Sequence, residues 1–474
     1  MPPMRESPEQ SALKPATAQP HLGVAAFGIW TQHVWIYWAN TSNRALPESV
    51  PWSTLYLIVS VAMLAMGFAL ARRTDASRDA RLARVGWMSA GAGALGSIAI
   101  ALASLWGSEA AALGGMLVGG IGFAGLYLWW GVFYSQIDLR SAILYLFGGG
   151  IVSALVKMLI GLAPPLVNAA IGCATPILSG LSCSSAFKHA KPPTSLDAPI
   201  FTRENIAALW KVALIFIVFS VANASMLALQ PPTQATSAPA VLFGVHGLEL
   251  ALCLMVIVYA VYFKKAFDFA QLWRIVMFLL ATDFLLNILF PDFFMQPFFA
   301  SVSLNFIVLF VWLTLTDISH HSSLSPLIIF GAGWCCYTLP FYAGSLLAAL
   351  APAAGGTLRY AAILLYVIAM ASAFCLETRD RSIALIFHDL SDSPHPVPDD
   401  FASIDARCER IAAHHHLTAR ELEVMQMLCR GRSKAYIAET LFITENTVKG
   451  HARRLYAKLG VHSKKELQQL IDAY

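Results

Sequence analysis

The stretch LYLIVSVAMLAMGFALA, Leu55 to Ala71, decides the fold class of this sequence. It contains no charged side chain, and a helix of this length crosses most of a hydrocarbon core about 30 Å thick. Twelve such runs lie along the chain, and they predict an all-α bundle of twelve membrane-spanning helices. The runs lie near residues 23–39, 53–71, 85–106, 111–133, 142–162, 165–183, 206–229, 239–262, 274–290, 297–316, 325–350 and 358–376.

The composition agrees with a membrane protein. Apolar residues make up 57% of the 474 residues and charged residues only 13%, whereas a soluble domain carries about 25% charged residues. This excludes an ordinary water-soluble enzyme. Charged residues gather after the last apolar run. We therefore expect a cytoplasmic leader (1–22), a twelve-helix membrane domain (23–376), a linker with a short helix (377–416) and a polar domain (417–474).

Basic residues in the loops predict the orientation. If both ends of the chain lie inside, the short inner loops carry twelve Lys and Arg residues, and the outer loops carry little beyond Arg44 and Arg359. Cytoplasmic loops hold the excess of basic residues in membrane proteins. The sequence therefore predicts a multi-pass protein of the inner (cytoplasmic) membrane with both termini in the cytoplasm.

The longest inner loop, residues 184–205, divides the apolar runs into six and six. This layout is similar to that of the major facilitator superfamily of transporters. However, the loop RRTDASRDARLARVG, residues 72–86, lacks the Gly-x-x-x-Asp-Arg-x-Gly-Arg pattern typical of that family. The resemblance therefore concerns the arrangement of the helices alone.

No pattern in the sequence indicates catalysis, a cofactor or a metal. The eight cysteines include no Cys-x-x-Cys pair, which leaves zinc binding and thioredoxin-like redox chemistry without support. His246 and Glu249 have the spacing of two metal ligands, but the sequence offers no third. A Ser/His/Asp pattern, a glycine-rich phosphate loop and a carboxylate pair are likewise missing. We therefore expect a protein that is not an enzyme and needs no cofactor.

The polar domain contains several residues typical of the N-terminal caps of helices. Each cap places a side-chain oxygen where the free N–H groups of a helix begin, and together they predict four short helices. The third of these begins after its cap and extends to about Leu459. The caps are Thr418 with Glu421, Ser433, Thr444, and Ser463 with Glu466.

The third helix of the polar domain carries charges of one sign on its outer face. Residues 430–465 contain nine Lys and Arg against two acids, Glu439 and Glu445. Such a face suits DNA phosphates and base edges. An isolated basic helix is usually a solvated surface. Here the helix follows a capped helix and a short turn, which is the helix-turn-helix arrangement.

The stretch LTARELEVMQMLCRGRSKAYIAETLFITENTVKGHARRLYAKLGVHSKKEL, residues 417–467, resembles the LuxR-type helix-turn-helix domain of bacterial transcription regulators. The matching motifs are Leu-Thr-x-Arg-Glu-x-Glu-Val at the start, Ile-Ala at 437–438, Thr-Val-Lys-x-His at 447–451 and Lys-Leu-Gly-Val-x-Ser at 458–463. The whole plan also resembles LuxR-type regulators with a polytopic membrane domain.

The resemblance implies roles for individual residues. DNA bases would be contacted by Lys449, Gly450 and Arg453, although the family often has a branched apolar residue at the position of Gly450. The fourth helix would form a dimer face through Leu467, Leu470 and Ile471. The residues implied to hold the DNA backbone are Lys434, Thr444, Thr447, His451, Arg454 and Lys458.

Ionisable side chains inside the apolar runs are candidates for sensing, because a charge within a bilayer is costly. His246 and Glu249 are three residues apart and share a helix face, and Lys157 is able to neutralise Glu249 or Asp283. We expect a cavity for a small polar or aromatic ligand. The alternative is that these groups only pair within the bundle. The candidate residues are Trp30, His33, Lys157, Asn223, His246, Glu249, Asp283, Asn287 and Asn305.

Taken together, these patterns predict a membrane-embedded one-component regulator. No receiver domain precedes the polar domain in this sequence, so the input would come from the membrane domain. The expected partners are double-stranded promoter DNA, a small-molecule ligand, the lipid bilayer, a second copy of the chain on DNA, and RNA polymerase. The main alternative is a secondary transporter with a regulatory DNA-binding tail. A membrane enzyme and a tail used only for protein contacts are the remaining alternatives.

Overall fold

The structure is a computed structural model. It describes residues 23–43, 53–72, 78–189, 201, 206–229, 239–263, 269–289, 297–351, 356–375, 386–387, 404–429, 437–438, 441, 444–461, 466–467 and 470. All regular secondary structure in these residues is helical, which confirms the predicted fold class. Two compact units result. The body holds the described residues up to Phe387, apart from 201, 206 and 207, and the tail includes those from Ile404 onward.

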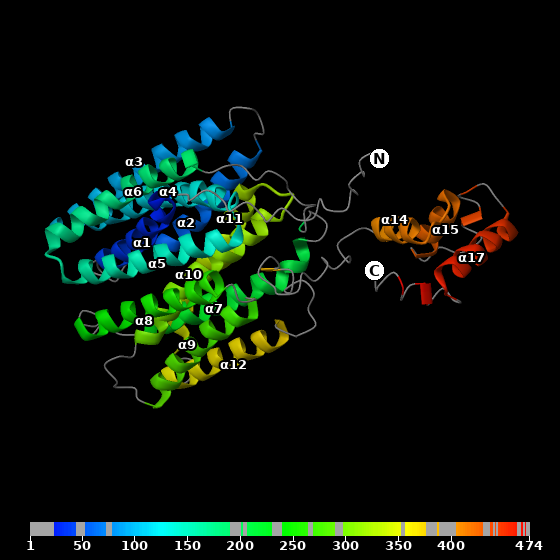
Figure 1. Cartoon of the computed structure of the whole chain (residues 1–474). Helices are drawn as coiled ribbons and strands as arrows, with labels where there is room; N and C mark the ends of the chain where they lie inside the picture. Colours follow the sequence, from blue (N-terminus) through cyan, green and yellow to red (C-terminus); the bar gives the residue numbers. More distant parts are fainter. Residues whose placement is uncertain are drawn as a thin grey trace, which may run out of the picture. The chain divides into compact units, whose positions relative to one another are not determined.

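Within the described part of the body, one helix lies at each position where an apolar run predicted a span (Figure 1). Ten of them, α2 to α11, are long and apolar enough to cross a membrane. The helices are α1 (Trp30–Asn43), α2 (Thr54–Ala71), α3 (Arg78–Trp106), α4 (Glu109–Tyr134), α5 (Leu139–Leu162), α6 (Pro165–His189), α7 (Trp210–Leu229), α8 (Pro239–Ile257), α9 (Phe269–Leu289), α10 (Pro297–His320), α11 (Pro326–Leu347) and α12 (Thr357–Cys375).

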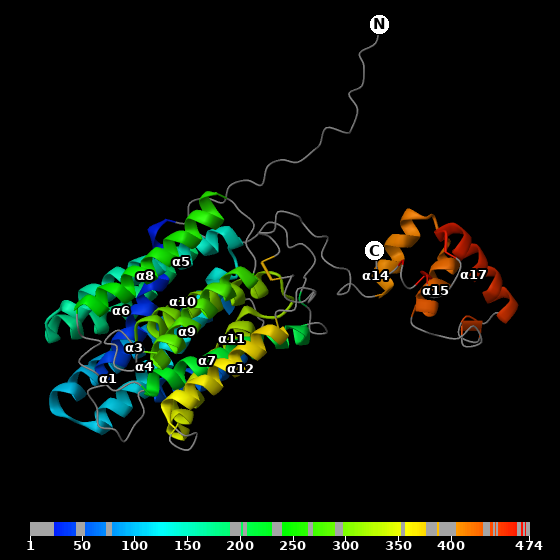
Figure 2. The same ribbon diagram turned by 90° about the horizontal axis from the view of Figure 1, so that it is seen from below.

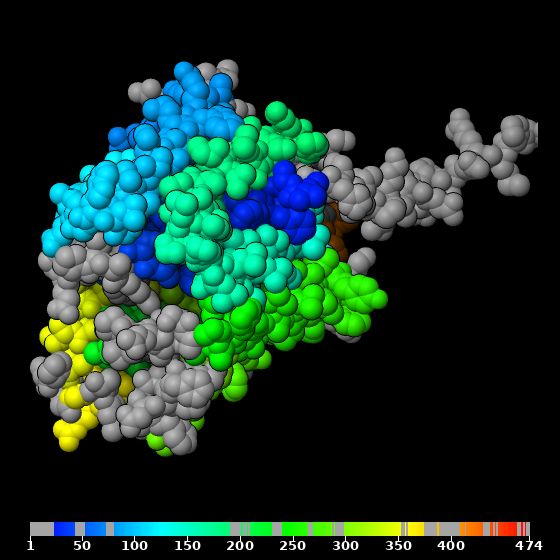
Figure 3. All heavy atoms as spheres, turned by 90° about the vertical axis from the view of Figure 1, so that its left-hand side faces the viewer, coloured from blue at the N-terminus to red at the C-terminus, as the bar shows by residue number. Residues whose placement is uncertain are grey.

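The first helix is short, with 14 residues, and a 3-10 helix of 6 residues, η2 (Val24–Ile29), precedes it. Together the two elements reach about 33 Å, since an α-helix rises about 1.5 Å and a 3-10 helix about 2.0 Å per residue. Their side chains are mostly buried, with Trp35 and Trp38 only 1% exposed. In Figure 3 the dark-blue start of this segment lies between the blue-green atoms of α5 and α6.

Two pairs of helices join the first six helices to the last six. Helix α2 packs against α11 (Figure 1), and α5 packs against α8 (Figures 1 and 2). Helices α2 and α8 are each the second helix of their half, and α5 and α11 are each the fifth. The two pairs therefore join equivalent helices, with the halves exchanged. The body therefore has the six-plus-six arrangement that the sequence predicted.

Close packing within the first half depends on glycine. A β-carbon on Gly122 of α4 would overlap the backbone of Gly93 on α3, and one on Gly96 would overlap that of Gly119. Small residues let two helix backbones approach closely where lipid supplies no hydrophobic drive for association. The glycine-rich stretch of α4 thus lets α3 and α4 pack closely.

After α12 the chain returns to the body. Ile386 and Phe387 are 2% and 1% exposed, and the Phe387 N–H donates to Oδ2 of Asp317 at 2.9 Å. The Phe387 ring lies 6.4 Å from the rings of Phe269 and Phe310, measured between centroids. Its backbone has a φ of 66°, which L-residues other than Asn and Asp rarely adopt. Asp317 lies near the end of α10, so this contact, here called the Phe387 anchor, holds the chain against that helix.

The tail has its own hydrophobic core. Three helices are described, α14 (Ile404–His414), α15 (Ala419–Cys429) and α17 (Glu445–Leu459). Each contributes buried side chains to one cluster, including Ile411, Val424 and Leu455 at 0% exposure. The predicted second and fourth helices lie largely outside the described residues. Because α14 belongs to the core, the folding unit begins before the predicted domain start at residue 417.

Candidate functional site

Three buried side chains and one half-buried side chain meet between α5, α8 and α10. Lys157, His246 and Glu249 are each about 2% exposed, and with Asn305 they form what we call the buried polar cluster. Lys157 Nζ donates to Glu249 Oε1 at 3.1 Å and to Asn305 Oδ1 at 3.2 Å. His246 Nδ1 and Asn305 Nδ2 donate to Glu249 Oε2 at 2.9 and 3.0 Å. The Glu249 carboxylate thus accepts three hydrogen bonds from three helices.

An aromatic residue of α1 covers this cluster. The Tyr37 ring meets the His246 ring edge-on at 5.4 Å, and Lys157 Nζ lies 5.9 Å from its centroid. His33, one helical turn earlier, is 5% exposed, and its Nε2 has no hydrogen-bond partner in the described part of the chain. The cluster lies at the α5–α8 contact, so it is shared by the two halves of the body.

Not all predicted sensing residues belong to this cluster. Asp283 Oδ1 accepts from the Ala300 N–H at 3.0 Å, and Asn223 Nδ2 donates to Ser303 Oγ at 3.0 Å. Both therefore bind the first turns of α10 instead. Trp30 is half-buried, and the side chain of Asn287 lies outside the described residues. Among the residues that the structure describes, no group of three metal-binding side chains occurs.

Sequence reasoning missed Asp317. This carboxylate is 1% exposed and holds the Phe387 anchor. Its position three residues before the end of α10 made it look like a loop residue. The only signal in the sequence was that this acidic residue directly follows an apolar run, at the start of a loop that contains no Lys or Arg.

In the tail, α17 is the best-defined element. The Thr444 hydroxyl accepts from the Thr447 N–H at 3.2 Å and caps the start of the helix. Gly460, with a φ of 67°, ends it in the left-handed conformation that favours glycine. Val448 and Leu455 are 0% exposed and anchor the inner face in the tail core. The predicted bounds of this helix are confirmed.

The outer face of α17 is basic. Lys449, Arg453, Arg454 and Lys458 are all exposed. Among the described residues, Lys449 and Arg453 form no ion pair, which leaves both cations available to an anionic partner. Gly450 lies between them, and a β-carbon there would meet nothing within 4 Å. The face thus presents two free cations on either side of an open backbone position.

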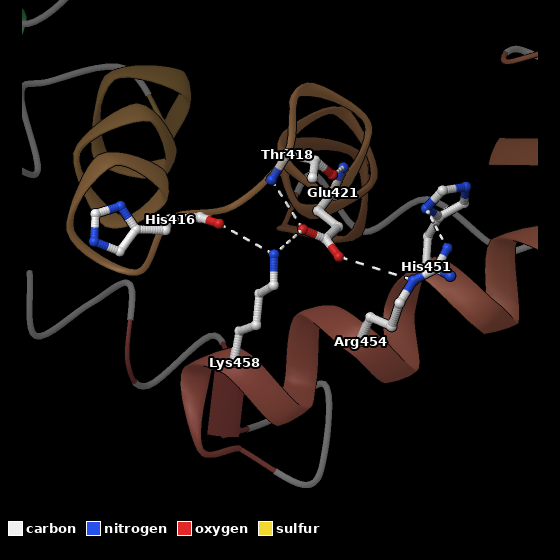
Figure 4. Close-up of polar contacts among 6 residues, drawn as sticks. All are labelled: His416, Thr418, Glu421, His451, Arg454 and Lys458. Carbon is white, nitrogen blue, oxygen red and sulfur yellow. Dashed lines mark hydrogen bonds and ion pairs between the residues drawn. The ribbon is translucent and has the colours of Figure 1, made fainter.

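The other two cations are bound to the neighbouring helix (Figure 4). Lys458 Nζ donates to Glu421 Oε2 at 2.8 Å and to the His416 carbonyl oxygen at 3.1 Å. Arg454 Nε lies 3.9 Å from Glu421 Oε1, and Arg454 Nη2 lies 3.2 Å from His451 Nδ1. These contacts fix α17 against the start of α15, so Lys458 has a structural role inside the tail.

Glu421 also completes the predicted capping box. Its Oε2 accepts from the Thr418 N–H at 2.9 Å, and the Glu421 N–H donates to the Thr418 hydroxyl at 3.3 Å. Burial raises the pKa of the Glu421 carboxyl, but hydrogen bonds from Lys458 and Thr418 outweigh burial and lower its pKa to about 2. Glu421 is therefore ionised at neutral pH.

Comparison with known proteins identifies the tail. Residues 415–471 match the model of the family described as "Bacterial regulatory proteins, luxR family". The tail carries a LuxR-type helix-turn-helix domain. Proteins of this family bind double-stranded DNA.

Relatives of the LuxR-type domain include two kinds of bacterial regulatory protein. The chain is 50% identical over 48 residues to a nitrate/nitrite response regulator protein homolog of Haemophilus influenzae. It is 41% identical over 51 residues to the oxygen regulatory protein NreC of Staphylococcus aureus. These matches cover 10% and 11% of this chain, and 23% and 24% of the relatives. The chain thus spans about a quarter of the length of the curated relatives it matches.

The body has a structural neighbour. The human organic anion transporter MFSD10 (TETRAN) superposes with a TM-score of 0.49 and 12% sequence identity. The superposition covers 75% of this chain and 98% of the transporter.

The structure corrects one residue of the LuxR-type domain. Leu467, predicted to face a second subunit, is 1% exposed within the core of the tail, because it packs beneath α14, α15 and α17. Leu470 is partly buried against the same core. Ile471 and Lys434 lie outside the described residues. The roles predicted for the exposed residues of α17 stay predictions.

Proposed function

We propose that this protein is a membrane-embedded one-component transcription regulator. Its body binds a small molecule, and its LuxR-type domain binds promoter DNA in the cytoplasm. One observation carries the proposal: α17 of the LuxR-type domain presents Lys449 and Arg453 exposed and without an ion pair among the described residues, on a chain whose body includes ten membrane-length helices in its described part. Lys449, Gly450 and Arg453 contact base edges, and the other exposed polar groups of α17 hold the phosphates.

The buried polar cluster supports ligand sensing. Taking charges out of water is expensive, and a buried pair repays this only when its remaining hydrogen bonds are satisfied. Lys157 and Glu249 join the two halves at the α5–α8 contact. A ligand that competes for either charge would loosen this contact. His33, whose Nε2 is buried and has no partner among the described residues, offers a further group to such a ligand.

The Phe387 anchor supports a route from the body toward the tail. Helix α10 contributes Asn305 to the buried polar cluster and Asp317 to the anchor. A shift of α10 that starts at the cluster therefore reaches the chain segment that follows α12. The segment then continues in sequence to the LuxR-type domain.

The remaining partners follow from this mechanism. A helix-turn-helix unit reads one half-site, and two half-sites lie about 34–36 Å apart, so two copies of the chain bind together. The protein resides in the inner membrane with both termini in the cytoplasm, where DNA and RNA polymerase are reached. Ligand binding alters the spacing or pairing of two tails and so alters promoter occupancy.

The test measures the gel mobility of DNA from upstream of the neighbouring genes. The protein added is a fragment of residues 401–474, which includes the whole described tail core. We expect a sequence-specific shift that Lys449→Ala and Arg453→Ala each weaken by about 1–3 kcal/mol. Arg410→Ala, which removes one cation from α14 instead, is the matched control and should retain specific binding. If no specific shift occurs even with artificially dimerised tails, DNA regulation is wrong.

The buried Lys157–Glu249 pair also favours a second candidate function, a secondary transporter with a regulatory DNA-binding tail. Charged side chains between two halves of a membrane bundle often mark a substrate path. Uptake into proteoliposomes distinguishes the two. A regulator binds its ligand at a fixed stoichiometry, whereas a transporter accumulates it in the lumen, and Glu249→Gln would abolish that accumulation.

A further inference from the structure

A group of four large aromatic side chains lies between the two halves of the body, on α4, α10 and α11. The Tyr127 ring lies 4.9 Å from Trp312 and 5.1 Å from Trp334, and Trp312 and Trp334 are 5.8 Å apart, all between centroids. Tyr337, one turn after Trp334, lies 5.5 Å from it. All four are at most 3% exposed. We call Tyr127, Trp312, Trp334 and Tyr337 the aromatic group.

Three polar atoms of the aromatic group lack partners. Trp312 Nε1, Trp334 Nε1 and the Tyr337 hydroxyl are buried, and none of them has a hydrogen-bond partner among the described residues. Buried Trp and Tyr side chains usually find such a partner, and an unmade hydrogen bond destabilises the fold. Other buried tyrosines of the body follow the rule: the Tyr134 hydroxyl donates to the Ala26 carbonyl oxygen at 3.0 Å. The two unpaired groups on one face of α11, Trp334 Nε1 and the Tyr337 hydroxyl, are therefore not explained by the fold alone.

We propose that the aromatic group is a binding site for a neutral, flat aromatic molecule that carries hydrogen-bond acceptor atoms. This inference rests on the proposed ligand sensing and adds a second binding site, for a neutral ligand, to the buried polar cluster. Ligand sites are mostly apolar and aromatic, with a few polar groups that fix orientation. The rings supply flat walls, and Trp334 Nε1, which is a donor only, requires an acceptor on the ligand.

The absence of charge near the aromatic group sets the ligand's charge. None of the Lys, Arg, Asp or Glu side chains that the structure describes is bonded to these four residues or lies over their rings. A charged ligand would therefore lose its water without gaining a counter-charge. The buried polar cluster already satisfies the Glu249 carboxylate with three donors. The aromatic group and the cluster thus differ in chemistry.

The position of the aromatic group links binding to a change of shape. Tyr127 belongs to the first half of the body, and Trp312, Trp334 and Tyr337 belong to the second. A ligand that enters between them replaces ring–ring contacts with ring–ligand contacts and separates the halves at this point. Trp312 lies on α10, the helix that also bears Asn305 and Asp317, so the separation acts on the same helix as the Phe387 anchor.

The test compares two isosteric substitutions in the purified full-length protein, Tyr337→Phe and Tyr134→Phe. Each removes one buried hydroxyl, but only Tyr134 uses its hydroxyl within the structure. Thermal unfolding is measured without ligand and then with coumarin or flavone, which are neutral and bear acceptor oxygens, or with 1-naphthoate, which is anionic. The substitutions and the probes do not involve the tail, so failure of DNA binding would leave this result unaffected.

We expect Tyr337→Phe to retain or raise the Tm and Tyr134→Phe to lower it by about 2–4 °C. Coumarin or flavone should raise the Tm of the wild type and of Tyr134→Phe by about 2–4 °C at saturating concentration, but not that of Tyr337→Phe. Naphthoate should have no effect. The proposal is overturned if Tyr337→Phe lowers the Tm as Tyr134→Phe does. It is also overturned if neither neutral probe raises the wild-type Tm, if both variants respond alike, or if naphthoate stabilises more strongly.

Discussion

At the scale of single residues, Glu421 links two functions of the tail. It caps α15 through Thr418 and holds α17 through Lys458. Its folded-state pKa of about 2 lies below the ordinary value of 4.5, so the ionised carboxylate stabilises the fold fully above pH 4.5. That contribution is lost as the pH falls toward 2. Urea unfolding of residues 401–474, followed by circular dichroism, should show stability decreasing between pH 4.5 and 2.

Glu421→Gln and Lys458→Met separate this contact from DNA binding. Each should lower the unfolding free energy at pH 7 by about 1–3 kcal/mol, because a buried charged hydrogen bond is left unmade, and Glu421→Gln should flatten the pH dependence below 4.5. Glu409→Gln, on the exposed face of α14, is the control and should leave both the unfolding free energy and DNA binding unchanged. If Lys458→Met weakens DNA binding while the unfolding free energy stays unchanged, Lys458 acts on phosphates and not on Glu421.

Gly450 lies inside α17, where a glycine weakens a helix. The space around it is open, since a β-carbon would meet nothing within 4 Å. Gly450→Ala should therefore raise the unfolding free energy of the tail by about 0.5–1 kcal/mol, measured by urea unfolding. A decrease in stability would contradict the open geometry. Specific DNA binding measured on the same variant then reports whether the DNA backbone or bases approach this glycine closely.

At the scale of elements, α10 joins distant parts of the body. Phe387, whose N–H is bonded to the buried Asp317, should exchange its amide hydrogen slowly. Asp317→Leu removes the acceptor and should accelerate exchange of this amide at least about tenfold, because an opening step is no longer needed. Asp317→Asn retains an acceptor oxygen and should remain slow. Equal, fast exchange in wild type and both variants, measured by mass spectrometry, would refute the anchor.

The elements themselves were largely predictable, whereas their contacts were not. Uncharged runs predicted the positions of the body helices, and caps such as Thr444 predicted where α17 begins. Both signals are local in sequence. In contrast, the sequence offered Lys157 two possible acidic partners, Glu249 and Asp283, and no reason to prefer either. The α5–α8 contact decides for Glu249, and Asp283 instead binds the start of α10.

The same limit applies to the candidate sites. The free cations Lys449 and Arg453 were predictable because a motif fixes their place on one helix face. Leu467 was misplaced because its burial depends on how three other helices pack. The aromatic group was invisible for a related reason: Tyr127 and Trp334 are more than 200 residues apart in the sequence, and only the fold brings their rings together.

At the scale of the whole molecule, two of the contacts between the halves differ in chemistry. The α2–α11 contact uses neutral groups, such as the hydroxyls of Ser60 and Thr338 at 2.7 Å. The α5–α8 contact uses the buried Lys157–Glu249 pair. Glu249→Gln alone should destabilise the body by about 3–5 kcal/mol, because it leaves Lys157 buried without a counter-charge, whereas Lys157→Met with Glu249→Leu should be nearly neutral.

Thermal unfolding of the full-length protein in detergent measures this cycle, with Lys211→Met as a control for loss of a lysine on α7. If the double variant is as unstable as Glu249→Gln, the pair contributes more than mutual neutralisation. A stable double variant that no longer responds to ligand would show that the charges serve the switch and not the fold.

The placement of Asn305 and Asp317 on a single helix has a mechanical consequence. The two residues are about 18 Å apart along the axis, since an α-helix rises about 1.5 Å per residue. Over that length an unbroken helix moves as a rigid body, so an axial displacement at one end is transmitted in full to the other end. A change of charge at the buried polar cluster would then displace the acceptor of the Phe387 N–H, with no diffusible messenger and no phosphate transfer in between.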